Sequence, residues 1–136
     1  MQVFLSYSPT DRTLARRIRN VLETSGLHVW DAEREIMPGD NWAEIVGQAL
    51  KTSEAMVVLL TPHSVQSPRI MGDIDYALGN MAYAKRLIPV LAGAPESFPQ
   101  GKIPWILRRL GMVSLPAPEA GEEELGKIPG LLQQAA

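Results

Sequence analysis

The 136-residue chain contains no cysteine. It therefore has no disulfide framework, no thiolate nucleophile and no thiolate ligand for zinc, a composition that suits a reducing compartment. The only two histidines, His28 and His63, stand far apart in the sequence. A histidine-based metal site or a catalytic triad would lack its ligands or its base. We therefore expect no metal site and no covalent thiol chemistry.

The chain also lacks a long basic run and a long apolar run. Its formal net charge of −2 gives no general attraction to phosphate backbones, so we expect no nucleic-acid partner. Residues 1–5 lack the basic region and the long apolar stretch of a signal peptide, and no apolar run reaches membrane-spanning length. We expect a cytoplasmic protein with no membrane partner.

What the chain does have is an ordinary globular composition, with 46% apolar and 21% charged residues. This balance argues against a disordered or fibrous class. A chain of 136 residues matches the usual size of one domain and is long enough to bury a core. We therefore expect residues 1–136 to form a single cooperative domain.

Apolar runs that favour strands alternate with stretches whose apolar residues recur at helical spacing. The predicted strands are 3–6, 28–30, 55–60, 87–91 and 112–115, and the predicted helices begin at Pro9, after Asn41, at Pro68, at Trp105 and at Glu122. The helix from Pro68 has an apolar stripe that runs to Met81, and Pro129-Gly130 is expected to interrupt the last helix. Pro89 would remove a ladder hydrogen bond, so we expect its strand toward a sheet edge or at a bulge.

The first helix begins at the dipeptide Ser8-Pro9, which supplies a capping hydroxyl followed by proline at the first helical position. Arg12, Arg16 and Arg19 fall outside its apolar stripe, and we expect them to form a solvated face.

Strands that alternate with helices specify a mostly parallel sheet covered on both faces, because parallel neighbours need right-handed crossover connections. We predict the α/β class, a flavodoxin-like doubly wound domain whose five-stranded parallel sheet has the order 2-1-3-4-5. With this order the topological switch point lies between the first and third strands, where ligands bind at the carboxyl ends. The loops at that point are residues 6–11 and 61–67.

Common phosphate-binding signatures are absent from the sequence. There is neither a G-x-G-x-x-G after the first strand nor a G-x-x-x-x-G-K-[ST] anywhere, which argues against a Rossmann dehydrogenase and a P-loop NTPase. The first strand ends in Ser6-Tyr7-Ser8, without the acidic cluster that a phospho-receiver needs.

Several stretches, in order along the chain, resemble the sequence boxes of one family. They are Phe4-Leu5-Ser6-Tyr7-Ser8 with Asp11-Arg12, Trp30 with residues 35–42, residues 57–62, Ser67-Pro68, residues 74–78 and residues 88–91. Their order and separations resemble those of the TIR (Toll/interleukin-1 receptor) domain family, here a prokaryotic-type TIR protein, over roughly residues 2 to 115. Each motif is weak by itself, and the ordered combination is specific.

The resemblance implies a signalling or defence role of the kind found in innate immunity and anti-phage systems. Some family members are NAD+ nucleosidases that hydrolyse or cyclise NAD+ and release nicotinamide, and others are self-associating adaptors. In the enzymes a glutamate on the helix after the third strand is the key carboxylate, and the residue aligned with it is Asp73. NAD+ would be the substrate, and no cofactor is expected.

Cleavage of the ribose–nicotinamide bond produces an oxocarbenium-like centre that a nearby carboxylate can stabilise. Asp73 keeps the charge of the family glutamate but is one methylene shorter, and a displacement of about 1 Å can cost on the order of a hundredfold in rate. Arg69, one helical turn before Asp73, stands where enzymatic members often carry an aromatic residue. Substrate stacking at that position would be lost.

The predicted substrate-binding residues could offer aromatic faces, hydroxyls or positive charge to a nucleotide. They are Ser6, Tyr7, Ser8, Arg12, Trp42 and Arg69. Structural roles explain several of the residues singled out so far equally well: Trp42 as a core residue of its amphipathic helix, Ser8 and Ser67 as helix caps, and Asp73 as a solvated helix carboxylate.

The BB loop of the resemblance corresponds to residues 31–40. It combines charged residues with a central apolar tip and the turn dipeptide Pro38-Gly39, which is typical of an exposed contact loop. The predicted interface residues are Glu35, Ile36, Met37, Pro38, Gly39 and Asp40. Through them the chain would associate with itself or with another TIR-containing protein, and a non-catalytic scaffold is the alternative function.

Overall fold

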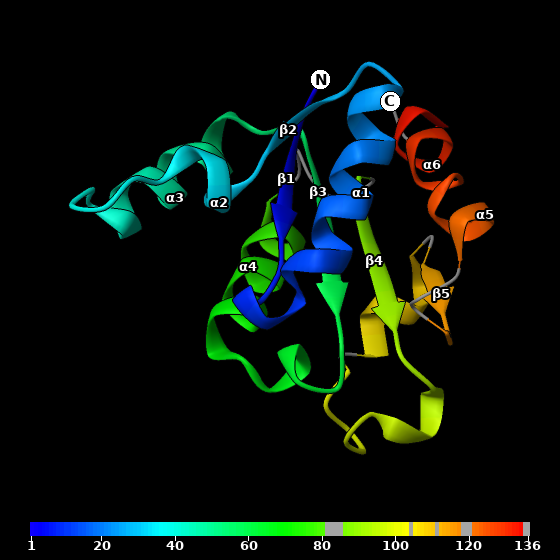
Figure 1. The fold of residues 1–136 in the computed structure, drawn as a ribbon. Coiled ribbons are helices and arrows are strands. Elements are labelled where there is room, and N and C mark those ends of the chain that lie inside the picture. Colours follow the sequence, from blue (N-terminus) through cyan, green and yellow to red (C-terminus); the bar gives the residue numbers. More distant parts are fainter. Residues whose placement is uncertain (81–85, 104, 111, 118–120, 135–136) are drawn as a thin grey trace.

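The computed structural model describes residues 1–80, 86–103, 105–110, 112–117 and 121–134. Its sheet has five strands in the order β2-β1-β3-β4-β5, and all neighbouring strands run parallel (Figure 1). The strands are β1 (Gln2–Ser6), β2 (His28–Trp30), β3 (Ala55–Leu60), β4 (Leu87–Ala92) and β5 (Val113–Leu115). The predicted fold class and strand order are confirmed.

The helices follow the strands as the periodicity predicted. They are α1 (Arg12–Thr24), α2 (Ala32–Glu35), α3 (Trp42–Thr52), α4 (Pro68–Gly79), α5 (Glu122–Leu125) and α6 (Ile128–Gln134), with 3-10 turns η1 (Pro9–Asp11), η2 (Ser64–Gln66), η3 (Pro95–Ser97) and η4 (Trp105–Arg109). Met81, expected on the stripe of α4, lies outside the described residues. Among the described helices, none is long and apolar enough to cross a bilayer.

Two predicted helix boundaries are wrong. Pro9 begins a 3-10 turn and α1 starts only at Arg12, and the Ser8 side chain forms no capping hydrogen bond. The last helix is interrupted before Pro129 rather than at it, because α5 ends at Leu125 and α6 begins at Ile128. Pro129 thereby falls in the first turn of α6, where a missing N–H group costs little.

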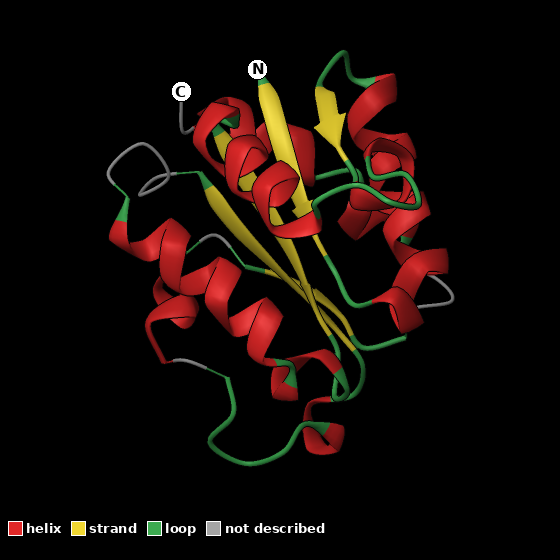
Figure 2. Ribbon diagram, turned by 90° about the vertical axis from the view of Figure 1, so that its left-hand side faces the viewer, coloured by secondary structure: helices red, strands yellow, loops and turns green. Residues whose placement is uncertain are grey.

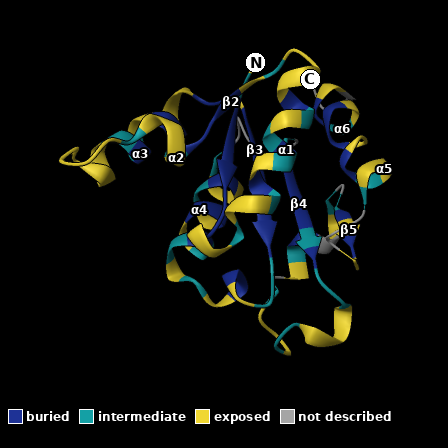
Figure 3. Ribbon diagram, in the orientation of Figure 1, coloured by how far each residue is buried: buried dark blue, intermediate teal, exposed yellow. Residues whose placement is uncertain are grey.

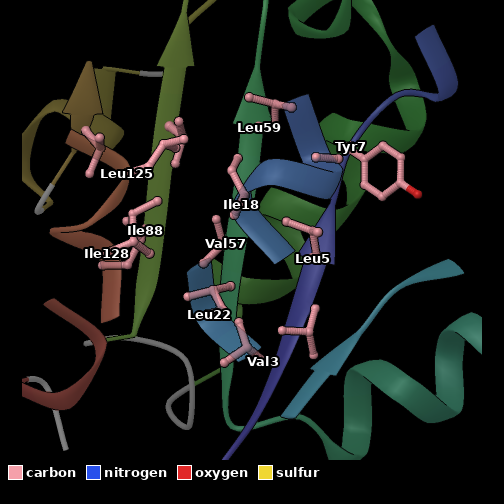
Figure 4. Packing of buried hydrophobic residues seen from close by; sticks show 14 of the residues in the cluster. Val3, Leu5, Tyr7, Ile18, Leu22, Val57, Leu59, Ile88, Leu125 and Ile128 are labelled. Carbon is pink, nitrogen blue, oxygen red and sulfur yellow. The ribbon is translucent and has the colours of Figure 1, made fainter. Parts of the chain in front are cut away.

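The sheet separates two apolar layers, and helices cover both of its faces (Figure 2). On one face, α1 and the pair α5 and α6 pack over alternate residues of the strands, with Leu5, Ile18 and Val57 near the centre (Figure 4). On the other face, α3, α4 and η4 pack over the intervening residues, among them Phe4 and Met56. All six residues of β3 are buried, as expected for a central strand covered on both faces.

The strand that contains Pro89 was expected toward a sheet edge or at a bulge, and it lies next to the edge strand β5 without being the edge strand itself. β4 lies between β3 and β5. Its pairing with β5 begins at Val90, one residue beyond Pro89, while Pro89 lies opposite Val58 of β3. The short β5 strand therefore lets an interior strand carry a proline, because the pairing with β5 starts only after it.

The segment after β2 extends away from the sheet and returns along α3, forming what we call the α2–α3 arm (residues 32–52), whose outer part is exposed (Figures 1 and 3). Residues 32–35 form a short helix where a loop was predicted, because the Asp31 carboxylate accepts a hydrogen bond from the Glu33 N–H group (3.0 Å). At the tip, the Asp40 N–H group donates to the Met37 carbonyl oxygen (3.1 Å), and Gly39 has a φ of +90° that favours glycine.

Candidate functional site

A cleft of about 290 Å³ lies where the end of β1 meets the α2–α3 arm and the start of α4. Its lining residues are Tyr7, Pro9, Arg12, Ala32, Glu33, Ile36, Trp42 and Arg69. The fold therefore brings Tyr7, Arg12, Trp42 and Arg69 together, although they come from four separate segments of the chain. Ile36, expected at a protein interface, also lines the cleft.

Asp73 lies on α4 one turn after Arg69, and it is buried, with 7% of its surface exposed. The Ser6 hydroxyl donates a hydrogen bond to its Oδ2 atom (2.8 Å). Burial raises the pKa of the Asp73 carboxyl, while the Ser6 hydrogen bond and the charge of Arg69 oppose this rise. The alternative of a solvated helix carboxylate is wrong, and neither Ser6 nor Asp73 is among the residues that line the cleft.

Arg69 covers the indole of Trp42, with its Cζ atom 4.2 Å from the ring centroid. Trp42 is 40% exposed, so its reading as a core residue of α3 is wrong. Burial lowers the pKa of the half-buried Arg69 guanidinium, and the negative charge of Asp73 opposes that change. The Nε atom of Arg69 is buried and has no hydrogen-bond partner among the described residues. The Arg69 guanidinium and the Trp42 indole, in contact with each other, thus form part of the cleft lining.

A buried polar cluster holds Tyr7 at the cleft. Its hydroxyl donates to Asp31 Oδ1 (2.6 Å), and Arg19 donates to Asp31 Oδ2 (2.6 Å). Asp31 is fully buried, and the pKa of Tyr7 is raised by burial and by its hydrogen bond to Asp31. Arg19 was expected on a solvated face and is instead a mostly buried partner of this carboxylate.

Sequence reasoning missed Asp31 as a site residue and treated it only as the beginning of a charged loop. One signal was present: an aspartate directly after a buried strand, followed by Ala32 and two acidic residues in the next turn, is typical of a helix cap. The link to Tyr7 and Arg19 had no local signal, since those partners lie 24 and 12 residues away.

Ser8 does not take part in the cleft. It is buried, and its hydroxyl lies 3.2 Å from the Thr10 hydroxyl. Ser67, by contrast, caps α4 by accepting a hydrogen bond from the Ile70 N–H group.

The two predicted switch-point loops meet beside a second cavity. Thr61 donates to Asp11 Oδ2 (2.9 Å) beside a cavity of about 310 Å³ that Thr10 and Ala92 also line. Four predicted substrate-binding residues line the 290 Å³ cleft on the β2 side of β1 instead: Tyr7, Arg12, Trp42 and Arg69. They meet there because the α2–α3 arm places Trp42 under Arg69. Of the two predicted loops, residues 6–11 therefore contribute to the cleft and residues 61–67 do not line it.

The parallel sheet and the cleft at the end of β1 define a flavodoxin-like α/β domain. The family model described as TIR domain matches residues 3–127, and the chain belongs to this family of signalling domains. A curated relative, the stimulator of interferon genes protein of Magallana gigas, is 29% identical over 93 residues, which cover 66% of this chain. The match spans only 22% of that relative.

Solved structures support the same fold. The TIR-STING receptor from C. gigas in complex with 2′,3′-cGAMP has a TM-score of 0.73 and 24% identity, over 98% of this chain and 38% of that one. The TIR domain of the Toll-related receptor TRR-2 from Hydra magnipapillata has a TM-score of 0.71 and 18% identity, covering 98% and 96% of the two chains. A short-chain flavodoxin is similar at a TM-score of 0.54.

Proposed function

We propose that this TIR signalling domain cleaves NAD+ at the nicotinamide–ribose bond when it is self-assembled, with Asp73 as the catalytic carboxylate. The observation that carries the proposal is the position of Asp73: buried, held by Ser6 and one helical turn from the cleft residue Arg69. A fixed carboxylate in a site of low dielectric stabilises developing positive charge more strongly than one in water. The product is linear or cyclic ADP-ribose, depending on the acceptor.

The dependence on assembly follows from access to this carboxylate. Asp73 is 7% exposed, and Arg69 lies over Trp42 at the cleft wall. The cleft therefore has to open before a ribose can reach Asp73. Ile36 belongs both to the BB loop and to the cleft lining, so a neighbour that docks on the loop can shift the cleft wall directly.

Nicotinamide release from NAD+ is the direct test. Purified protein in the presence of a crowding agent should release nicotinamide at a rate per chain that rises with protein concentration, because assembly opens the site. Chromatographic quantification of nicotinamide over a concentration series measures this. A complete lack of release at the highest concentration, with assembly verified by sedimentation, would contradict the enzymatic proposal.

The alternative function is a non-catalytic module that assembles through the BB loop, and the exposed tip of the α2–α3 arm favours it. Met37 is 61% exposed at that tip. Met37→Asp should abolish self-association in sedimentation velocity, because it places a charge in the apolar centre of the contact, where charged residues are depleted. The fold should be unaffected, since the side chain has little packing to lose.

Leu78→Asp is a matched control, because Leu78 is also an exposed apolar residue but lies on α4 away from the loop. It should sediment as the wild type does. If Met37→Asp and the wild type sediment identically under assembly conditions, the BB loop is not the contact surface. If Met37→Asp loses self-association and the wild type releases no nicotinamide, the scaffold function is supported.

A further inference from the structure

Two guanidinium groups, those of Arg12 and Arg69, line the cleft, while Asp73, whose negative charge acts on Arg69, lies outside the lining. Arg12 donates through Nε to the carbonyl oxygen of Pro9 (3.1 Å), which is a neutral acceptor. Among the described residues, neither Arg12 nor Arg69 forms an ion pair. Two cations that line the same concave site repel one another, and an anion bound between them removes this repulsion.

The one acidic residue that lines the cleft is already engaged. Glu33 accepts from the Nε atom of Arg16 (3.2 Å) and lies 3.9 Å from Arg19. Its pKa is lowered, chiefly by the hydrogen bond from Arg16. The charge of Glu33 is therefore compensated by residues outside the cleft lining. The lining keeps the guanidinium groups of Arg12 and Arg69, and the buried Asp73 offsets part of the charge of Arg69 from outside the lining.

Arg69 is also held in an unfavourable position. Its guanidinium is partly desolvated, and its Nε donor is buried without a partner among the described residues. A buried donor that makes no hydrogen bond is costly, and the cost is recovered when the side chain turns toward an acceptor. The face of Trp42 that a nucleotide ring could use is at the same time covered by Arg69.

We propose that Arg12 and Arg69 form an anion subsite that binds the diphosphate of a nucleotide, and that Arg69 makes this cleft select for phosphate rather than for a stacked ring. Guanidinium groups match phosphate oxygens in geometry and bind them with two parallel hydrogen bonds. The inference rests on the proposed function, since the same cleft would receive NAD+.

ADP-ribose is a suitable probe, because it keeps the diphosphate and has no nicotinamide to release. Isothermal titration at low salt should give a dissociation constant that Arg69→Gln and Arg12→Gln each weaken about 10- to 100-fold, the effect of losing a charged hydrogen bond. Raising the salt concentration should weaken wild-type binding, because partly exposed charges are screened. Inorganic diphosphate should compete, and adenosine should bind at least tenfold more weakly than ADP-ribose.

Two further variants separate charge from folding. Lys51→Gln removes an exposed positive charge at the opposite end of α3 from Trp42 and should bind ADP-ribose as the wild type does. Arg69→Lys keeps the charge but not the planar fork, and its affinity should fall between the wild type and Arg69→Gln. Thermal melting of each variant verifies that it is folded.

The proposal is overturned if wild-type protein does not bind ADP-ribose, if adenosine binds equally well, or if both glutamine variants bind like the wild type. Its failure can be told apart from failure of the catalytic proposal. Binding of ADP-ribose without nicotinamide release would reject catalysis and keep the anion subsite. Nicotinamide release that is unaffected in Arg12→Gln and Arg69→Gln would keep catalysis and reject the subsite.

Discussion

Asp31→Ala is expected to lower the free energy of unfolding by about 3–5 kcal/mol, the usual effect of removing one partner from a buried ion pair. Asp31 is fully buried and accepts hydrogen bonds from Tyr7, from Arg19 and from the Glu33 N–H group. The substitution leaves the Arg19 guanidinium, whose side chain is 16% exposed, without its hydrogen-bonded anion and with only the more distant Glu33 at 3.9 Å. It also leaves the Tyr7 hydroxyl without an acceptor and α2 without its cap.

Urea denaturation followed by circular dichroism measures the loss. Glu33→Gln is the matched control: it removes an ion pair with Arg16 in which the two side chains are 50% and 30% exposed, and such exposed pairs contribute little to stability because solvent screens them. If Asp31→Ala and Glu33→Gln destabilise the protein equally, the buried cluster does not have the structural role assigned to it.

The strand positions could be predicted because each strand carries its own signal, and their order followed from the flavodoxin-like alternation of strands and helices. The continuous apolar run of β3 is what a strand buried on both faces requires, and the short polar loops after β1 and β3 leave room for crossover helices. Helix positions could be predicted because the apolar residues of each helix recur at helical spacing. Boundaries were less certain, as the 3-10 turn at Pro9 shows, because a proline at the first position suits either kind of helix.

The polar cluster around Asp31 could not be predicted, because it depends on tertiary contacts. Arg19 lies off the apolar stripe of α1 and has the local features of a solvated residue. Its side chain is mostly buried because it forms an ion pair with Asp31, the residue directly after β2. Trp42 illustrates the opposite case, in which an apolar residue on a helical stripe stays exposed because it is the first residue of α3 and lies in the exposed stretch 37–44.

The same contacts join the BB loop to the cleft. Asp31 caps α2, the first element of the arm, and also holds the hydroxyl of Tyr7, which lines the cleft. Ile36, the residue directly after α2, lines the cleft. A displacement of the arm in an assembly therefore acts on two sides of the cleft, on Tyr7 through Asp31 and on the apolar wall through Ile36.

Asp73→Asn is expected to lower nicotinamide release by about 100- to 1,000-fold, the range for losing one preorganised electrostatic contact in an active site. The amide has the size of the carboxylate and can still accept the hydrogen bond from Ser6, but it carries no charge to stabilise the oxocarbenium-like centre. The assay uses assembled protein with NAD+. Asp75→Asn, an exposed carboxylate on the same helix, is the control and should release nicotinamide at the wild-type rate.

Stability measurements show whether such a loss is chemical or structural. Burial raises the pKa of Asp73 above its ordinary value of 3.8, so the native state keeps this proton at a pH where the unfolded chain has lost it. Native stability therefore falls as the pH rises through that window, and Asp73→Asn removes this fall. The variant should be at least as stable as the wild type at neutral pH although it releases nicotinamide far more slowly. Equal nicotinamide release by Asp73→Asn and the wild type would exclude Asp73 as the catalytic carboxylate.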